Sequence, residues 1–358
     1  MENYDLIVIG SGPAGRRAAI QAAKLGKSVL VVENRLRVGG VSVHTGTIPS
    51  KTLRETVLNL SGWRERGFYG LAYRVKKDIE GKDLGARLRM TLDHEIDVLE
   101  HQFARNGVRT VAGKARFIDA HTLAVRNGDD TDHMFEAKNT VIAVGTAPFR
   151  PKHIPFNETS VFDSDNVAAD DRGRLKVDPK TFQTNVPNIY AAGDVIGFPS
   201  LASTAMEQGR IAACHAFGAP IPPAPEYFPY GIYAVPEIST VGLTEQEVKD
   251  KGIPYECGIA RFRETSRGHI MGLQGGMMKL IFSLKTRRLL GAHIIGEGAT
   301  ELIHIGQAVL NLKGTVDYFV ENAFNYPTLA EAYKIAALDA FNRMPPRDPG
   351  KAAPIADV

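Results

Sequence analysis

The stretch DLIVIGSGPAGRRAAIQAAKLGKSVLVVEN, near the start of the chain, constrains the fold more than any other feature. An apolar run from Asp5 to Ile9 meets the pattern Gly10-x-Gly12-x-x-Gly15, a helical pattern follows, and a second apolar run ends at Glu33. A strand, a glycine turn, a helix and an acid-terminated strand are together typical of a dinucleotide-binding unit. The sequence therefore predicts an α/β fold that begins with a Rossmann-like domain, a parallel sheet with helices.

Each residue of this fingerprint has a mechanical role. Gly10 allows the tight turn, Gly12 lets a pyrophosphate approach the backbone, and Gly15 lets the helix pack closely on the strand. The helix N-terminus offers N–H groups to the phosphates. Glu33 stands where a carboxylate would accept the ribose hydroxyls, which favours an unphosphorylated adenosine ribose, as in NAD or FAD.

Composition bounds the other possibilities. A chain of 358 residues is long for one core, so two domains are expected. A net charge of +3 gives no reason to expect a nucleic-acid partner, and no apolar run approaches the ~18 residues that a membrane span needs. Two cysteines cannot make a disulfide framework, and no metal site is predicted. A strand pattern begins almost at once, without room for a signal peptide, so a cytoplasmic location is expected.

Three later stretches favour FAD over NAD. GGVSVHTGTIPSK follows the second strand directly, and NTVIAVGTAPFRP is an apolar strand that ends at Gly145 and Thr146. TNVPNIYAAGDVIGFPSLASTAMEQGRIAA is a further strand that ends at Asp194, with a helix beginning near Leu201. An acid at the carboxyl edge of a sheet is well placed to bind a polyol chain, and a helix start suits a flavin carbonyl.

These stretches, with GTIPSKTLRE, GIYAVPEISTVGLTE, ELIHIGQAV and FNYPTLAEAYKIAAL, resemble the flavoprotein disulfide reductases, the FAD/NAD-linked class I pyridine nucleotide-disulfide oxidoreductase family. Within that family the chain looks most like the soluble, Si-specific pyridine nucleotide transhydrogenases. The resemblance covers nearly the whole chain apart from one gap and the tail. It implies FAD as the cofactor, NADP(H) and NAD(H) as substrates, and a homodimer.

The resemblance also implies the roles of individual residues. Lys51 should lie near flavin N5, Asp194 should bind the ribityl chain, and Ala202 should lie near flavin O2. The full cofactor-binding set that it implies is Gly10, Gly12, Pro13, Ala14, Gly15, Glu33, Gly39, Gly40, Lys51, Ala115, Gly145, Thr146, Asp194 and Ala202.

The redox cysteines of the disulfide reductases are missing. Their two positions read Ser42 and Thr47, so a dithiol relay is chemically impossible, and hydride must pass through the flavin directly. Cys214 and Cys257 lie far away in the sequence, and Cys214 is expected to fill a core. His44, the histidine of the redox loop, is interpreted as a hydrogen-bonding residue rather than a catalytic one.

The acid–base partner of the disulfide reductases is missing as well. Tyr326 stands in place of its histidine, and Glu331 matches the glutamate behind it. By the resemblance, both would approach the flavin from the partner subunit. Glu331 also has a structural interpretation, because Thr328-x-x-Glu331 reads as a capping box that opens the last helix.

A second dinucleotide-binding domain, which binds the nicotinamide in this family, has no counterpart in the sequence. Only a short passage joins Thr146 to Gly193, and the join lies near Val167 to Asp171. About a hundred residues, one domain's worth, are absent there. The predicted domains are an FAD-binding domain over 1–225, an α+β dimerisation domain over 226–343 and a flexible tail over 344–358.

Three functions remain open at this point. The first is the family reaction, NADPH + NAD⁺ to NADP⁺ + NADH, impaired because the nicotinamide domain is missing. The second is a non-catalytic module that binds flavin or dimerises. The third is an NAD(P)H oxidase or diaphorase that passes electrons to oxygen or quinones.

Overall fold

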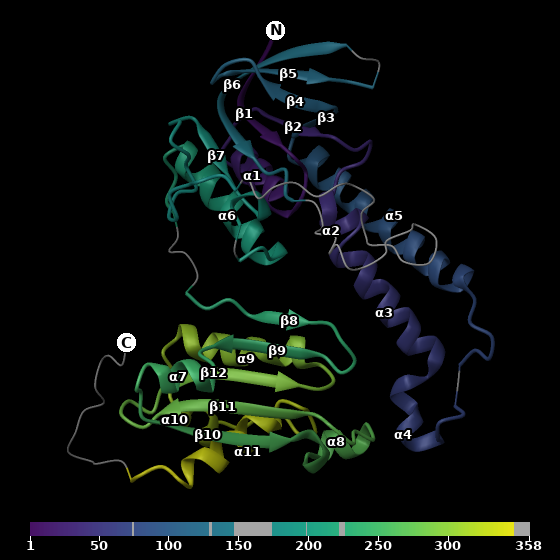
Figure 1. Ribbon diagram of the computed structural model, residues 1–358, viewed down its shortest axis with the longest axis vertical. Coiled ribbons are helices and arrows are strands. Elements are labelled where there is room, and N and C mark those ends of the chain that lie inside the picture. The colour runs from purple at the N-terminus through teal and green to yellow at the C-terminus, as the bar shows by residue number, and fades with distance from the viewer. Residues whose placement is uncertain (74, 129–130, 147–173, 198, 222–225, 347–358) are drawn as a thin grey trace. The chain divides into compact units, whose positions relative to one another are not determined.

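The computed structural model describes residues 1–73, 75–128, 131–146, 174–197, 199–221 and 226–346. The chain divides into two compact units (Figure 1). Unit 1 consists of Met1–Val57 and Asp78–Ala224, and unit 2 of Leu58–Lys77 and Pro225–Val358. No helix among the described residues combines the length and the apolar character that crossing a membrane demands.

Residues Leu58–Lys77 belong to unit 2, whereas the sequence analysis assigned them to the first domain. Two contacts within unit 2 explain the difference. Arg64 donates to Glu297 at 2.8 Å, and the ring of Phe68 lies where a Cβ atom at Gly272 would be. No local pattern in the sequence signals either contact.

Unit 1 is built on a sheet with the order β3-β2-β1-β6-β5-β4, in which β7 also pairs with β6. The pairs β1/β2, β2/β3, β1/β6 and β6/β7 are parallel, whereas β4/β5 and β5/β6 are antiparallel. The α/β prediction is therefore confirmed. The strands are β1 (Glu2–Ile9), β2 (Val29–Glu33), β3 (Arg109–Ala112), β4 (Lys114–Phe117), β5 (Thr122–Arg126), β6 (Asp132–Ile142) and β7 (Ile189–Ala191).

The alternation of buried side chains along β1 gives the sheet two covered faces. Leu6 and Val8 pack into the main core of unit 1, whereas Ile7 packs into a smaller core with Leu123 of β5. The three β1 side chains, Leu6, Ile7 and Val8, are fully buried, as expected for a central parallel strand. Each such side chain contributes about 1.5–3 kcal/mol to folding.

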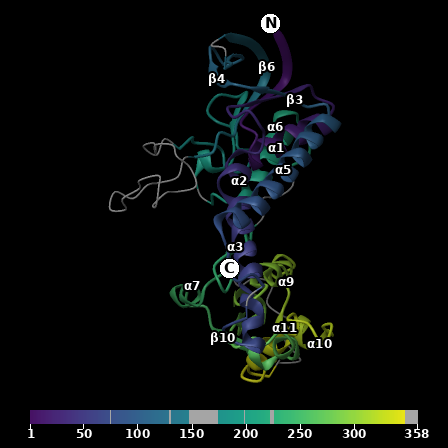
Figure 2. The ribbon, with the colours of Figure 1, turned by 90° about the vertical axis from the view of Figure 1, so that its right-hand side faces the viewer.

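Helix α1 lies against α6 in the main core, and small residues permit a very close approach. A Cβ atom at Gly209 of α6 would lie only 2.0 Å from the carbonyl oxygen of Ala14. The long helix α5, prominent in Figures 1 and 2, adds Leu99 and Phe103 to the same core. The helices that begin in unit 1 are α1 (Pro13–Lys24), α2 (Gly40–His44), α3 (Thr47–Ser61), α5 (Gly81–Arg105), the 3₁₀ turn η2 (Asp194–Ile196) and α6 (Ala202–Ala216).

Unit 2 holds an antiparallel sheet with the order β10-β11-β12-β9-β8. Helices α9 and α11 enclose its main core, where Tyr333 stacks on Phe319 with ring centroids 5.4 Å apart. Its elements are η1 (Trp63–Glu65), α4 (Arg66–Tyr69), β8 (Tyr230–Ile232), β9 (Ile238–Gly242), α7 (Glu245–Asp250), β10 (Tyr255–Arg261), η3 (Phe262–Glu264), α8 (Ser266–Ile270), β11 (Met277–Ser283), β12 (Leu289–Ile295), α9 (Ala299–Asn311), α10 (Val316–Glu321) and α11 (Glu331–Phe341).

The capping box predicted at the start of the last helix is wrong. Helix α11 begins at Glu331 with Ala330 as its N-cap, and no side chain caps it. The Thr328 hydroxyl donates to the carbonyl oxygen of Asn325 instead, at 2.7 Å. Thr328 thus serves the preceding turn, a competing local hydrogen bond that threonine makes readily.

Candidate functional site

A cavity of about 570 Å³ opens at the carboxyl ends of β1, β2, β6 and β7 in unit 1. Ligands of open α/β sheets bind at this edge, and the volume lies in the usual range for small-molecule sites. The lining residues are Ile9, Gly10, Ser11, Gly12, Pro13, Ala14, Val32, Glu33, Asn34, Arg35, Gly40, Val41, Ser42, Thr47, Gly113, Lys114, Ala115, Ala143, Val144, Gly145, Thr146, Ala192, Gly193, Asp194, Ser200, Ala202 and Ala205.

The three glycines of the first turn differ in what surrounds them. Gly10 has φ +101°, and a Cβ atom there would lie 2.4 Å from the carbonyl oxygen of Ala143. A Cβ atom at Gly15 would lie 1.9 Å from the carbonyl oxygen of Gly10. At Gly12 the nearest atom would be Cα of Gly40, at 3.9 Å. The protein itself needs Gly10 and Gly15, whereas Gly12 leaves open space in the cavity for a ligand.

Helices α1 and α6 both begin at the cavity wall. Helix α1 starts at Pro13 after Gly12, and α6 starts at Ala202 after Leu201. Neither N-cap residue makes a side-chain hydrogen bond to the first turn. The N–H groups of a first turn have no acceptor within their own helix, and they favour negative charge. The cavity therefore offers two sets of donors suited to phosphate or to another anionic group.

Glu33 ends β2 and is buried, with only 7% of the residue exposed. Its Oε2 accepts hydrogen bonds from the N–H of Ser11 at 2.9 Å and from the Ser11 hydroxyl at 2.5 Å. Its Oε1 accepts from the N–H of Arg35 at 3.0 Å. A carboxylate has about four acceptor positions. These three donors thus hold the side chain while leaving it able to accept a hydroxyl of a ligand.

Asp194 lines the cavity just beyond the end of β7. Burial raises the pKa of this carboxyl above its ordinary value. The turn before it is held because the N–H of Gly193 donates to Oε1 of Gln208 on α6, at 2.9 Å. A polar hydroxyl chain in the cavity would offset the desolvation of Asp194, because a hydrogen bond to the charged form stabilises it.

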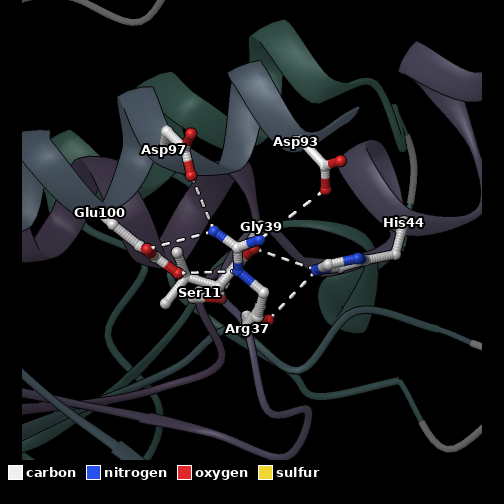
Figure 3. A network of polar contacts seen from close by, with 8 residues as sticks. Ser11, Arg37, Gly39, His44, Asp93, Asp97 and Glu100 are labelled. Atoms are coloured by element: carbon white, nitrogen blue, oxygen red, sulfur yellow. Dashed lines mark hydrogen bonds and ion pairs between the residues drawn. The ribbon is translucent and has the colours of Figure 1, made fainter. Parts of the chain in front are cut away.

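The loop between β2 and α2 is held from three directions (Figure 3). The Ser11 hydroxyl accepts from the N–H of Gly39 at 2.8 Å. His44 Nε2 lies 3.1 Å from the carbonyl oxygen of Arg37 and 3.0 Å from that of Val38, so this nitrogen must donate. His44 is thus a hydrogen-bonding residue, as interpreted from the sequence. The Arg37 guanidinium reaches three carboxylates of α5, Asp93, Asp97 and Glu100.

Ser42 and Thr47, at the redox-cysteine positions, both line the cavity. The Ser42 hydroxyl donates to the carbonyl oxygen of Gly39 at 3.1 Å. Cys214 is buried in the core on α6, as predicted, and burial raises its pKa. Cys257 lies on β10 of unit 2, and burial raises the pKa of its thiol to about 11. A thiol with a raised pKa is a poor nucleophile, so neither cysteine suits a redox relay.

Most of the predicted cofactor-binding residues line this cavity; Gly15, Gly39 and Lys51 do not. Gly15 serves helix packing, and Gly39 donates its N–H to Ser11. Lys51 lies on α3, and partial burial lowers the pKa of its ammonium. The N–H and hydroxyl contacts of Ser11 were missed from sequence, although this residue lies inside the glycine motif.

The two predicted pocket residues of the partner subunit lie in unit 2. The Tyr326 hydroxyl lies 2.6 Å from the Ser266 hydroxyl, and the Tyr326 side chain is largely exposed. Glu331 Oε1 accepts weakly from the N–H of Arg267, at 3.4 Å. Tyr326 therefore lies at the surface of its unit, whereas Glu331 is partly buried.

Comparison with known proteins agrees with this geometry. The family described as pyridine nucleotide-disulphide oxidoreductase matches residues 4–164 and 155–209, and its dimerisation domain matches residues 228–337. The soluble pyridine nucleotide transhydrogenase of Mycobacterium bovis (strain BCG / Pasteur 1173P2) is 40% identical over 466 positions, covering 96% of this chain and 98% of that protein. The protein of the same name from Photorhabdus laumondii is 33% identical over 462 positions, covering 96% and 99%.

Two solved structures share the fold. LpdA from Mycobacterium tuberculosis superimposes with a TM-score of 0.79 at 19% identity, covering 94% of this chain and 99% of that one. The HOCl-induced flavoprotein disulfide reductase RclA from Escherichia coli gives 0.78 at 18% identity, with the same coverage. The predicted architecture, an α/β domain followed by an α+β domain, is thereby confirmed.

The alignment with the Mycobacterium bovis protein also measures what this chain lacks. Its 466 positions exceed the 358 residues of the chain by 108, so the relative has at least that many positions without a counterpart here. The predicted join near Val167 to Asp171 lies outside the described residues. The family matches, the similarity to soluble transhydrogenases and the dinucleotide cavity together establish that this chain belongs to the pyridine nucleotide-disulphide oxidoreductase family, as a flavoprotein oxidoreductase.

Proposed function

We propose that this protein binds FAD in the cavity of unit 1 and that its family reaction is hydride transfer from NADPH to NAD⁺ without a redox disulfide. The observation that carries this proposal is the presence of Ser42 and Thr47 in the wall of the same cavity as the glycine turn. A disulfide reductase needs two cysteines at that place, because their disulfide takes up a pair of electrons to become two thiols, and hydroxyl groups have no such redox couple.

The residues of the cavity fit FAD. The N-terminus of α1 and the open space at Gly12 suit the pyrophosphate. Glu33 suits the adenosine ribose, and Asp194 suits the ribityl chain. The N-terminus of α6 at Ala202 suits a carbonyl oxygen of the flavin ring.

Bound FAD would supply the two-electron acceptor that takes hydride from one nicotinamide and returns it to another. The protein's own residues would position the cofactor and exclude water from it. Without thiols there is no thiol proton to manage, which explains why Tyr326 can replace a histidine. Lys51, whose ammonium is partly buried on α3, would place a positive charge toward flavin N5.

The turnover of this chain would be impaired. Family members bind the nicotinamide with a second dinucleotide-binding domain, and the 108 unmatched positions amount to about one such domain. Unit 1 contributes one glycine fingerprint, which the adenosine end of FAD would occupy. NADPH would then meet the flavin without dedicated contacts for its phosphates, so its apparent affinity would be low.

The proposed assembly is a cytoplasmic homodimer. The dimerisation-domain match over residues 228–337 supports self-association. In such a dimer, the exposed Tyr326 and its neighbour Glu331 would contribute to the flavin pocket of the partner subunit. A non-catalytic flavin-binding module is the second candidate, and the unmatched positions of the alignment favour it.

An anaerobic absorbance experiment tests the proposal. The purified protein should show the visible band of bound flavin, and excess NADPH should bleach this band slowly, with restoration by NAD⁺. Dithionite provides the control, because it reduces any bound flavin. A flavin band that dithionite bleaches and NADPH leaves intact would support the non-catalytic module. Restoration by oxygen and not by NAD⁺ would point to an oxidase, and a protein without any flavin band would contradict FAD binding.

A further inference from the structure

We infer that Ser11 is a positioning residue for the adenosine end of the cofactor, because its hydroxyl and N–H fix the carboxylate of Glu33 against the cavity. This inference rests on the proposed function in one respect only, that the cavity holds an adenosine diphosphate group. It assigns a role to the first variable position inside the glycine motif, where the motif itself demands no particular side chain.

The hydrogen bonds of Ser11 to Gly39 and Glu33 leave its hydroxyl a single orientation. The N–H of Gly39 can only donate, so the Ser11 oxygen accepts from it, at 2.8 Å. The Ser11 hydroxyl proton is then directed to Oε2 of Glu33, which also accepts from the N–H of Ser11. A serine hydroxyl has one proton to donate, and here it is committed. Ser11 is 1% exposed, so water does not compete for these bonds.

The geometry divides the two oxygens of Glu33 between different tasks. Both bonds from Ser11 fall on Oε2, whereas Oε1 accepts from the N–H of Arg35. Without the clamp that the Ser11 hydroxyl provides, the carboxylate of Glu33 would keep only backbone N–H donors, those of Ser11 and Arg35, and its side-chain torsions would be less restricted when a ligand hydroxyl arrives. The clamp therefore removes conformational entropy before a ligand arrives, which is how preorganisation raises affinity.

A fixed carboxylate also discriminates between nucleotides. Glu33 can accept from a ribose 2′-hydroxyl, but it would repel a 2′-phosphate held at the same position. Because Ser11 prevents Glu33 from turning away, the clamp should matter for the rejection of 2′-phosphorylated nucleotides as well as for the binding of unphosphorylated ones.

A matched pair of residues at the other end of the same strands provides a control. The Ser28 hydroxyl donates to Oδ2 of Asp5 at 3.0 Å and accepts from the N–H of Asp5 at 2.9 Å. This pair makes the same hydroxyl-to-carboxylate bond as Ser11 and Glu33, at an exposed position where Lys138 also contacts Asp5, and neither member lines the cavity. Ser28→Ala thus reports the loss of such a bond without a change at the site.

The experiment is calorimetric titration of the nucleotide-free protein with ADP, 2′-phospho-ADP and FMN. Ser11→Ala should weaken ADP binding about tenfold, because ADP would then have to immobilise the Glu33 side chain when it binds. It should weaken 2′-phospho-ADP binding less, leave FMN binding unchanged, and have almost no further effect on ADP in the Glu33→Ala background. Ser11→Cys, with a similar shape and a weak donor, should resemble Ser11→Ala.

Three results would overturn the inference. The first is an ADP affinity of Ser11→Ala equal to that of Ser28→Ala. The second is a loss of affinity in Ser11→Ala that is the same for FMN and for ADP. The third is a loss of ADP affinity in the double variant Ser11→Ala/Glu33→Ala that equals the sum of the losses in the two single variants. Thermal melting of each variant without nucleotide separates a loss of folding from a loss of positioning. ADP binding requires no hydride transfer, so these outcomes are independent of whether NADPH reduces the flavin.

Discussion

The glycines of the first turn have two different roles, and each role belongs to a single residue. One glycine permits close packing of the backbone, and another leaves room for a ligand. Gly15 has no room for a Cβ atom, because the carbonyl oxygen of Gly10 would lie 1.9 Å away. Gly12 has room, since its nearest neighbour would lie at 3.9 Å. Two residues of one motif are thus glycine for different reasons, one set by the protein and the other by the space that a ligand needs.

The substitution Gly12→Ala should change the free energy of unfolding by less than about 0.5 kcal/mol and should weaken FAD binding. Gly15→Ala should destabilise the protein by about 1–3 kcal/mol, because the overlap with Gly10 forces the backbone apart. Urea unfolding without cofactor and titration with FAD measure the two effects. Equal loss of stability in both variants would contradict this assignment.

The sequence was sufficient to predict that residues of one local pattern would lie together around a cavity. Gly10, Gly12 and Glu33 follow from one strand–helix–strand pattern, so the cavity could be located before the fold was known. The bond between Ser11 and Gly39 could not, because it joins residues 28 positions apart through a loop without regular spacing. Which serine faces which carboxylate is decided by tertiary packing.

At the scale of elements, the sheet of unit 2 contains a half-buried histidine that joins two strands. His293 on β12 places Nδ1 2.8 Å from the Thr240 hydroxyl of β9 and Nε2 3.0 Å from the carbonyl oxygen of Leu243. The carbonyl can only accept, so Nε2 carries the proton and Nδ1 accepts from Thr240. Burial lowers the pKa of His293 below its ordinary value of 6.5, and nearby Lys279 lowers it further.

This arrangement makes the stability of unit 2 dependent on pH. The lowered pKa means that the unfolded chain binds the His293 proton more tightly than the folded one. The contribution of His293 is therefore fully present above about pH 6.5 and is lost as the pH falls below that value. Between about pH 7.5 and about pH 5.5, His293→Gln should show a smaller fall in the urea midpoint than the wild-type chain. A fall of the same size in both would count against His293 as the titrating group.

Element boundaries show where local patterns were enough and where they were not. The pattern Thr244-x-x-Glu247 forms a capping box at the start of α7, with the Thr244 hydroxyl accepting from the N–H of Glu247. The same pattern at Thr328 does not form a capping box, because the Thr328 hydroxyl donates to the carbonyl oxygen of Asn325 instead. Both motifs have the same spacing, so the difference arises from the backbone path before the helix.

For the whole molecule, the surface of unit 2 supports self-association. Its described residues include large apolar side chains that are exposed to solvent, among them Leu312 at 82% exposure and Ile232 at 56%. A contiguous exposed apolar patch is typical of an interface between proteins, and Leu312 lines one surface hollow together with Tyr318, which is 44% exposed. The dimerisation-domain match covers all three residues.

We therefore expect a dimer in solution. Sedimentation equilibrium should give about twice the chain mass of 39.0 kDa, without dependence on bound flavin. The replacement Leu312→Glu, on the exposed end of α9, should shift the equilibrium toward monomer if this surface contributes. A mass of one chain at micromolar concentration would exclude the proposed homodimer.

The pairing of β6 with β7 has an evolutionary consequence. Thr140 to Ile142 lie directly beside Ile189 to Ala191, so the sheet of unit 1 is complete whatever length of chain connects the two strands. A gene can then gain or lose coding sequence between them without altering the strand register on which the cavity depends. Natural variants of this lineage should accordingly differ more often in what lies between β6 and β7 than in the strands themselves.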